Sequence, residues 1–461
     1  MARLIQTERQ RIQHLLRRAG FGYSLTDLND YVNIGWEASV NKLVDYSESN
    51  DRMTINVVGE KPGDVPFDRI PTHQSFRIRQ IWNLRLINSP WPLQEKMTYF
   101  WHDHFATELN KVGFAQLLHD QNQLFRDHAL GNFYDLLLGV TRDGAMLKYL
   151  DNRLNRRGKP NENYARELLE LFTLGEGVKY SEVDVAEGAR ALTGWQLPHR
   201  KDKNGKLEPS EVVFNRRLHD SGLKSFLGEN GYLRDESLVR ILHELPETAD
   251  FIGRKLWIFF SGTNPTPEQL KATTGSYIDS DGSIKEIVRT ILLSDEMYSD
   301  QAYRSRIKSP VEFVVGSVRA LEMKTSGLAE ISEMRSMGQN LYDPPSVAGW
   351  AGEQDWINGN SVIARANFAN SITQKKIRNS KIRSIDIPNL FASYGADGTA
   401  SDAVEFLVDL LVGGDVDQET RKILEEHIGG KYHYNFDQAS SSGTLNNLVY
   451  LAMTMPVYHL S

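Results

Sequence analysis

The sequence contains no cysteine in its 461 residues. This absence excludes disulfide bonds, iron–sulfur clusters, zinc sites with thiolate ligands and a cysteine nucleophile. A metal ion bound by side chains would therefore rely on histidine, aspartate and glutamate. The lack of cysteine does not assign a compartment, because exported and cytosolic proteins can both lack this residue.

Long apolar runs are also missing. No stretch of the sequence approaches the roughly 18 consecutive apolar residues that a transmembrane helix needs, so we expect no membrane span. The residues from Met1 to Thr7 lack the apolar core of a signal peptide. As the sequence stands we therefore expect a cytoplasmic protein, or an exported one if a leader has been removed.

The chain has no excess of positive charge. Its formal net charge is −7 and its pI is about 6.0, which argues against nucleic-acid binding. It also lacks the G-x-x-x-x-G-K-[ST], G-x-G-x-x-G, G-x-S-x-G and H-E-x-x-H patterns. The commonest nucleotide-binding, serine-hydrolase and zinc-hydrolase functions therefore have no motif support.

The spacing of apolar residues predicts an all-α fold. Apolar residues recur at helical intervals through most of the chain, as in Ser75–Asn88 and Leu93–Phe105, and segments with the period of a strand are few. We expect a large multi-helix domain over residues 1–380 and a C-terminal helical subdomain over 381–461, packed on the first. Residues 197–231 are rich in proline, glycine and charge, which predicts one long irregular insertion with a short hairpin near Val212–Phe214.

Residues Asn161–Gly175 predict one helix with a capping residue at each end. Its polar residues fall together on one side, namely Glu162, Asn163, Arg166, Glu167, Glu170 and Thr173. This side is either a solvated surface on which Arg166 neutralises a neighbouring carboxylate, or the lining of a site. In a site, Glu167 and Glu170 can bind a cation or share a proton.

A second polar segment is Trp101–Phe105, which holds His102, Asp103 and His104. On a regular helix the two histidines project roughly 200° apart, so they can share one metal ion only if the helix ends between them. If the helix is regular, we expect one histidine in the core and the other at the surface.

A third segment, Leu218–Lys224, places His219, Asp220 and Lys224 beside a glycine-bearing turn. Such a group can position an anion or a metal ion, and a plain polar loop has the same composition. The fourth segment holds Trp350 after a proline pair, followed closely by Trp356. These two rings suit a platform for a sugar or another ring, and they suit a packed core equally well.

Several segments in this order resemble the bacterial domain-of-unknown-function family numbered 1800. They are Leu15–Gly22, Trp101–Phe105, Glu162–Gly175, Leu192–Trp195, His219–Asp220, Phe251–Trp257, Ser309–Phe313 and Tyr342–Trp350. The resemblance extends over about residues 10–455. It implies no established activity and no assigned catalytic residue. Members of the family are often encoded beside alkaline-phosphatase-like proteins, and many carry export signals.

One hypothesis is an enzyme in which these polar segments meet in one cleft around a divalent cation. Histidine and carboxylate ligands favour Zn, Mn or Fe, whereas a site dominated by oxygen favours Mg or Ca. The expected reaction is metal-assisted hydrolysis of an anionic or sugar-like small molecule. The residues expected to hold the metal are His102, Asp103, His104 and Glu170.

The remaining candidates have catalytic or binding roles. Glu167 is the expected general base, and Arg166 or Lys224 would hold an anionic group of the substrate. The remaining catalytic candidates are His219 and Asp220. The residues expected to contact the substrate or a glycan are Asn163, Trp350 and Trp356.

The alternative hypothesis is a non-catalytic partner or assembly protein that works with an alkaline-phosphatase-like protein. The same polar residues would then form hydrogen-bond networks that fix the packing of helices. The region around Trp350 and Trp356 would be a docking surface. The two hypotheses differ in whether the ionisable side chains of distant segments share one pocket.

Overall fold

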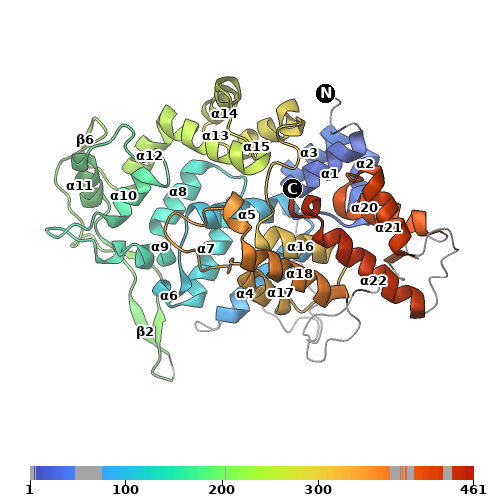
Figure 1. The fold of residues 1–461 in the computed structure, drawn as a ribbon. Helices are drawn as coiled ribbons and strands as arrows, with labels where there is room; N and C mark the ends of the chain where they lie inside the picture. The colour runs from blue at the N-terminus through green and yellow to red at the C-terminus, as the bar shows by residue number, and fades with distance from the viewer. Residues whose placement is uncertain are drawn as a thin grey trace.

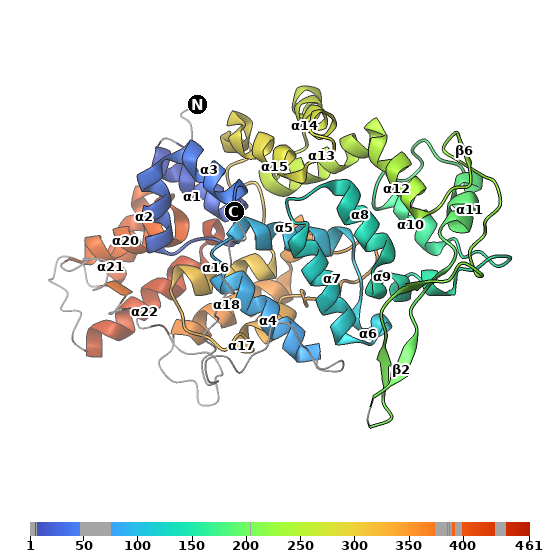
Figure 2. The ribbon, with the colours of Figure 1, turned by 180° about the vertical axis from the view of Figure 1, so that it is seen from behind.

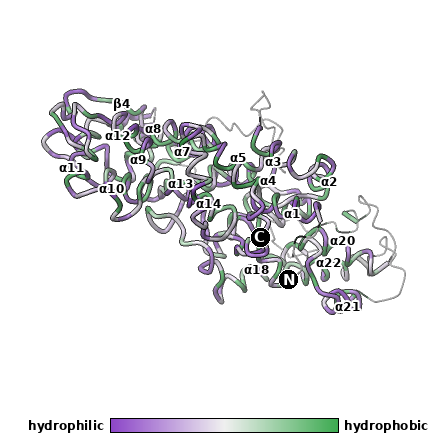
Figure 3. Tube along the Cα trace, turned by 90° about the horizontal axis from the view of Figure 1, so that it is seen from above, coloured by the Kyte–Doolittle hydropathy of each residue, from purple (hydrophilic) through white to green (hydrophobic). Residues whose placement is uncertain are grey.

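The computed structural model describes residues 5, 7–46, 75–202, 204–373, 385, 387, 390–391, 399–428 and 439–461. The described residues are mostly helical, with three two-stranded antiparallel sheets, which confirms the all-α prediction. The molecule is elongated (Figure 1). Helix α11 and the strands lie at one end, and α1–α3 with α20–α22 lie at the other, as Figure 3 also shows from above.

Three helices form the N-terminal part of the chain, namely α1 (Glu8–Arg18), α2 (Leu25–Ile34) and α3 (Trp36–Val44). Helix α1 begins with a capping box, in which the backbone N–H of Gln10 donates to the Thr7 hydroxyl and that of Thr7 donates to the Gln10 side chain. The apolar spacing of residues 28–44 predicts a single helix there, and the structure corrects this to two. Gly35, with φ of +83°, separates α2 from α3, because few other residues adopt that conformation.

The centre of the molecule is a group of helices around α5. They are α4 (Ser75–Asn88), α5 (Pro92–His104), α6 (Leu109–Val112), α7 (Ala115–Asp127), α8 (Phe133–Arg142) and α9 (Gly144–Tyr149), followed by the 3-10 turn η1 (Asn152–Leu154). Leu93, Met97 and Trp101 of α5 are fully buried in the apolar core. Helix α5 therefore runs through the interior and carries its polar residues into the protein.

Helices α10 (Asn163–Glu170) and α11 (Glu182–Ala191) lead into the predicted insertion, which forms short hairpins. Strand β1 (Trp195–Gln196) pairs with β4 (Val213–Phe214), β2 (His199–Lys201) pairs with β3 (Leu207–Pro209), and β5 (Lys224–Phe226) pairs with β6 (Glu229–Gly231). The predicted strand near Val212–Phe214 is therefore present. The β2–β3 hairpin projects away from the body in both ribbon views (Figures 1 and 2).

Four helices follow along one long side of the molecule (Figure 1). They are α12 (Asp235–Glu244), α13 (Pro246–Ser261), α14 (Pro267–Asp279) and α15 (Ile284–Leu293), followed by η2 (Asp295–Tyr298). Helix α13 has a largely apolar inner face, with Ile252, Leu256 and Phe260 fully buried. This face packs against the core. Lys255, one residue before Leu256, thereby reaches His104 at the end of α5.

The remaining elements are α16 (Pro310–Ala320), α17 (Ala329–Ser336), η3 (Glu353–Trp356), α18 (Gly359–Thr373), α20 (Ala400–Val412), α21 (Gln418–His427), α22 (Ala439–Thr454) and η4 (Pro456–His459). Helix α22 packs along α18, where the Asn446 side-chain amide donates to the carbonyl of Thr373. The domain boundary predicted between residues 380 and 381 lies outside the described residues. Among the described helices, none has the length and apolarity needed to cross a bilayer.

Candidate functional site

The C-terminal end of α5 is the point where distant segments meet. His104 contacts Phe172, which follows α10, and Lys255 of α13. Asp103, one residue earlier, accepts a hydrogen bond from Trp350. The end of α5 thus contacts the segment after α10, the Tyr342–Trp350 segment and α13.

His104 is held in one tautomer by its two partners. Its Nε2 lies 3.1 Å from the carbonyl oxygen of Phe172, and its Nδ1 lies 2.8 Å from Nζ of Lys255. Because a carbonyl only accepts, Nε2 carries the hydrogen and Nδ1 accepts from Lys255. Burial lowers the pKa of His104 well below its ordinary value, and the charge of Lys255 lowers it further. His104 is therefore neutral, with no free lone pair for a metal ion.

His102 lies on another side of α5 and is buried as well. Its Nε2 accepts the backbone N–H of Tyr342 at 3.2 Å, and its ring packs edge-on against Trp82. Burial lowers the pKa of His102 to about 3. The expectation of one core and one surface histidine was wrong, because α5 lies inside the protein and both rings are covered.

Asp103 is half-buried between α5 and the Tyr342–Trp350 segment. Its Oδ1 accepts the backbone N–H of Trp350 at 2.8 Å. Burial raises the pKa of Asp103 to about 6, opposed by the Trp350 hydrogen bond and by the charges of Lys255 and Arg306. Gly349 allows this close approach, since its φ is +81° and a Cβ there would lie 2.3 Å from Asp103 Oδ1.

Lys255 completes the group that we call the Asp103–Lys255 site, defined as Asp103, His104 and Lys255. It is half-buried, and burial lowers its pKa, while the negative charge of Asp103 opposes that change. A carboxyl with a raised pKa beside a lysine with a lowered pKa is typical of functional sites. Sequence reasoning gave Lys255 no role, although its place one turn from Phe251 and Phe259, on a largely apolar helix, was a signal.

The residues predicted to hold a metal ion are not gathered in one place. Among the residues that the structure describes, no group of three or more histidine, aspartate and glutamate side chains could hold a metal ion. Glu170 lies on α10 and faces Arg166, whereas both ring nitrogens of His104 and Nε2 of His102 already have hydrogen-bond partners. His102, Asp103, His104 and Glu170 thus do not form a site with three protein ligands.

Helix α10 is shorter than predicted. Glu162 occupies the N-cap position without a side-chain hydrogen bond, whereas Asn161 accepts the backbone N–H of Asn163 at 3.0 Å just outside the helix. The helix ends at Glu170, and Gly175, with φ of +98°, follows one turn later. The predicted cap at Asn161 was therefore wrong by one position, while the predicted left-handed glycine is present.

The polar side of α10 is a solvated face with charge pairs. Arg166 pairs with Glu182 at 2.7 Å, and with Glu162 and Glu170 at 3.6 Å and 3.5 Å. Glu167 is half-buried, and burial together with the charge of Glu170 raises its pKa. Asn163 is exposed. This arrangement corresponds to the alternative in which Arg166 neutralises its neighbours.

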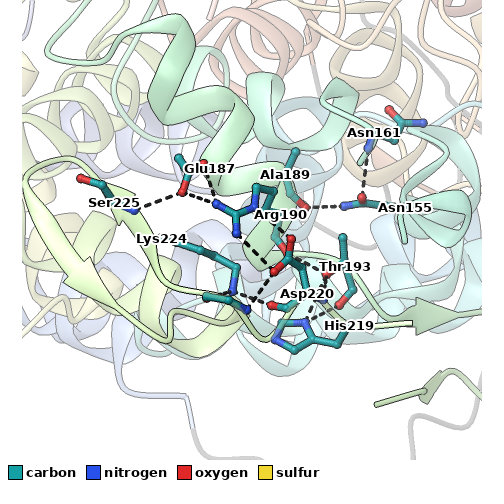
Figure 4. A network of polar contacts seen from close by, with 11 residues as sticks. Asn155, Asn161, Glu187, Ala189, Arg190, Thr193, His219, Asp220, Lys224 and Ser225 are labelled. Carbon is teal, nitrogen blue, oxygen red and sulfur yellow. Dashed lines mark hydrogen bonds and ion pairs between the residues drawn. The ribbon is translucent and has the colours of Figure 1, made fainter. Parts of the chain in front are cut away.

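His219, Asp220 and Lys224 belong to a second group, which we call the Arg190 network (Figure 4). It consists of Glu187, Arg190, Thr193, His219, Asp220 and Lys224. Arg190 Nε donates to Asp220 Oδ2 at 2.9 Å, and its Nη1 donates to both oxygens of Glu187 at 2.8 Å. The Arg190 hydrogen bond lowers the pKa of Asp220 to about 2.

The other members of the Arg190 network also have partners within the chain. His219 Nδ1 donates to the carbonyl of Thr193 at 2.9 Å, and Lys224 Nζ donates to the carbonyls of Asp220 and Gly222 at 2.6 Å and 3.0 Å. Ser225 N–H donates to Glu187. The network thereby holds the segment that leads into β5 against α11. The sequence indicated no role for Arg190 and Glu187, because their i,i+3 spacing is typical of charge pairs on the surface of any helix.

The two tryptophans have different environments. Trp350 is half-buried, and its ring lies 5.7 Å from that of His102. Trp356 is 7% exposed, and its carbonyl accepts the hydroxyl of Ser361. Trp356 therefore packs in the interior and offers no open platform, whereas Trp350 borders the Asp103–Lys255 site.

Comparison with known proteins gives one family. Neither the curated proteins nor the solved structures contain a match to this chain. The family model described as "Protein of unknown function (DUF1800)" matches residues 14–460. That range covers nearly the whole sequence and includes both groups of polar residues described above. The chain therefore belongs to this family of proteins of unknown function.

Proposed function

We propose that this protein is an enzyme that uses Asp103 and Lys255 for acid–base chemistry on an anionic or sugar-like small molecule. The observation that carries the proposal is a half-buried carboxyl with a pKa of about 6 that interacts electrostatically with a lysine of lowered pKa. Both groups are oriented, Asp103 by the N–H of Trp350 and Lys255 by the lone pair of His104.

Hydrolysis is the reaction class that these groups support best. Near neutral pH a carboxyl with a pKa of about 6 is mostly ionised, yet it exchanges its proton readily. The Asp103 carboxylate would take a proton from the water molecule that attacks the substrate. Lys255 would donate a hydrogen bond to the oxygen on which negative charge develops. The proposal assigns no step to a metal ion.

The test is a panel of chromogenic phosphate, ester and glycoside substrates, assayed from about pH 5 to about pH 9. We expect Asp103→Asn and Lys255→Met to lower kcat/KM by a factor of roughly 10² to 10⁴. Wild-type activity should fall below about pH 6 as Asp103 becomes protonated. Glu333→Gln is the matched control, because Glu333 is also half-buried with a pKa raised by burial, but lies on α17. Equal activity in all variants would refute the proposed roles.

A second candidate is a non-catalytic partner of an alkaline-phosphatase-like protein. The Arg190 network favours this candidate, because its charged side chains form hydrogen bonds within the chain. This candidate predicts no turnover on any substrate of the panel. It also predicts that the protein co-purifies with an alkaline-phosphatase-like protein, with Asp103→Asn binding as well as the wild type.

A further inference from the structure

A small cavity lies beside α16, where this helix meets α1, α20 and η4. Its volume is about 30 Å³, and it is partly open to solvent. It is bordered by the end of α1 and the turn that follows, by α16, by α20 and by η4. The polar side chains in its lining are those of Arg17, Tyr23, Lys308, Glu312, Tyr458 and Ser461. It shares no lining residue with the Asp103–Lys255 site.

Several hydrogen-bond donors at this cavity have no partner. Arg17 is only 5% exposed, and its Nη1 donates to the Tyr23 hydroxyl, but its Nε and Nη2 have no partner. The buried Ser461 hydroxyl also lacks one. Lys308 Nζ lies over the Tyr458 ring, 4.0 Å from its centre. Buried donors left unpaired are costly, so their presence together indicates a missing acceptor.

Positive charges gather around the cavity. Burial lowers the pKa of Lys308 well below its ordinary value, and the charges of Arg17 and Arg304 lower it further. Glu312 is the carboxylate in the lining, but it already forms an ion pair with Lys96 and accepts the backbone N–H of Ser309. Its negative charge is thus already shared with a cation outside the cavity.

The neighbouring carboxylates are also occupied. Asp409 pairs with Arg9 at 2.6 Å, and Asp415 pairs with Arg304 at 2.7 Å. The charge of Glu312 does act on Lys308, but among the described residues neither Arg17 nor Lys308 forms an ion pair with a side-chain carboxylate. A buried cation without a counter-charge is strongly disfavoured, and an anion bound between the two would relieve that cost.

We propose that this cavity binds a small oxyanion, a phosphate or carboxylate group, between Arg17 and Lys308. The free Nε and Nη2 of Arg17 form a fork of donors that can bind two oxygens of such a group. Lys308 and the Ser461 hydroxyl can donate to the same oxygens. The volume exceeds the roughly 10–15 Å³ that one water molecule requires, so one or two oxygens of the group can enter while the rest of the group lies toward solvent.

The proposal gives a role to two sequence segments that the proposed enzyme site does not use. Leu15–Gly22 supplies Arg17, and Ser309–Phe313 begins α16 directly after Lys308. Gly22, with φ of +82°, brings the turn after α1 against α16, where a Cβ would lie 3.5 Å from Cα of Gly316. Arg17 and Lys308 both line the resulting cavity.

The first test is the thermal unfolding of the full chain in sodium phosphate, in sodium acetate and in sodium chloride of equal ionic strength. We expect a saturable rise of about 2 °C in Tm with phosphate or acetate beyond the effect of chloride. Comparison of the two oxyanions distinguishes a phosphate site from a carboxylate site. The absence of a saturable rise with either oxyanion would overturn the proposal.

The second test locates the site with variants. Direct titration by ³¹P NMR, with acetate as competitor, should show binding weakened at least about tenfold in Lys308→Met and in Arg17→Lys. Lys308→Arg keeps the charge and should keep binding. Lys148→Met is the matched control, because Lys148 also lies over an aromatic ring, that of Phe114, and burial also lowers its pKa. If Lys308→Met does not fold, binding by Arg17→Lys tests the location of the site. Unchanged binding in either folded variant contradicts the assignment.

Discussion

The Arg190 network and the Asp103–Lys255 site each combine a histidine, an aspartate and a lysine, and they differ in what their carboxylates contact. Asp220 accepts hydrogen bonds from Arg190 and from the N–H of Gly222, and its pKa falls to about 2. Asp103 has the N–H of Trp350 as its partner, and burial raises its pKa to about 6. Residue type alone therefore does not tell a structural group from a candidate reactive one.

The two lysines show the same difference. Lys224 donates to two backbone carbonyls and closes its loop. Lys255 donates to the lone pair of His104, which is itself fixed by the carbonyl of Phe172. In the first group the polar atoms hold chain segments together. In the second group Lys255 donates to the His104 ring and Asp103 accepts a backbone N–H, and both residues are half-buried.

The largest effect on stability should come from removing the close approach at Asp103. Gly349→Ala would place a Cβ 2.3 Å from Asp103 Oδ1 and 2.6 Å from its carbonyl oxygen, at a φ of +81°. We expect a loss of about 3 kcal/mol in the free energy of unfolding, measured with urea. Gly338→Ala is the control, because Gly338 has φ of +101° with nothing within 4 Å of the added Cβ. Equal losses in the two variants would mean that backbone strain alone explains the effect.

The next effect is on the Arg190 network. Arg190→Met would leave Asp220 and Glu187 without their cation, and we expect it to lower the free energy of unfolding by about 2 kcal/mol. Amide hydrogen exchange in residues 219–226 should accelerate in the same variant. Arg240→Met removes two exposed pairs, with Glu229 and Glu244, and should cost at most about 1 kcal/mol. If Arg190→Met cost no more than Arg240→Met, the network would be a surface feature only.

Asp103 and Asp220 should change the stability of the protein in opposite directions as the pH rises. Because Asp103 has a raised pKa in the folded state, the wild type is favoured when Asp103 is protonated and loses stability as the pH rises from about 4 to about 6. Asp103→Asn should therefore be more stable than the wild type by about 2 kcal/mol near pH 8, with little difference near pH 4.

Asp220→Asn should behave in the opposite way. The pKa of Asp220 is lowered to about 2, so its contribution is present above the ordinary value of 3.8 and is lost as the pH falls through 2. Asp220→Asn should therefore destabilise the protein at neutral pH. Denaturation curves at several pH values measure both variants. If Asp103→Asn were less stable than the wild type at high pH, the two aspartates would not differ in the direction of their pKa shifts.

The smallest effect should come from Lys224. Lys224→Met removes two hydrogen bonds to carbonyls, and we expect a loss of about 1 kcal/mol in the free energy of unfolding. Faster hydrogen exchange should be confined to the turn before β5. Lys179→Met, which removes an exposed pair with Glu247, is the control and should leave that turn unchanged. An equal change in both variants would assign Lys224 to the surface.

Local patterns predicted the helices well and the site only in part. The spacing of apolar residues predicted a helix at Ser75–Asn88, with the bounds that the structure has. The Gly35 break was missed, because the apolar spacing continues through it. These are local properties of neighbouring residues, so the sequence displays them directly.

The candidate site depends on contacts between residues far apart in the chain. Asp103 was singled out, but as a metal ligand, because burial and the Trp350 contact could not be read from the sequence. Lys255 lies 151 residues beyond His104, its hydrogen-bond partner, and no short pattern links the two. The pKa values that distinguish Asp103 from Asp220 arise from packing, which the sequence of either segment does not contain.

The β2–β3 hairpin offers a practical route into these experiments. At its tip the Asp202 side chain accepts the backbone N–H groups of Asn204 and Lys206, and a Cβ added at Gly205 would meet nothing within 4 Å. A fluorophore or an affinity tag grafted there would extend away from the helical body (Figure 1). The protein could then be anchored to a sensor chip at that hairpin, which contributes no residue to the Asp103–Lys255 site or to the lining of the cavity beside Arg17.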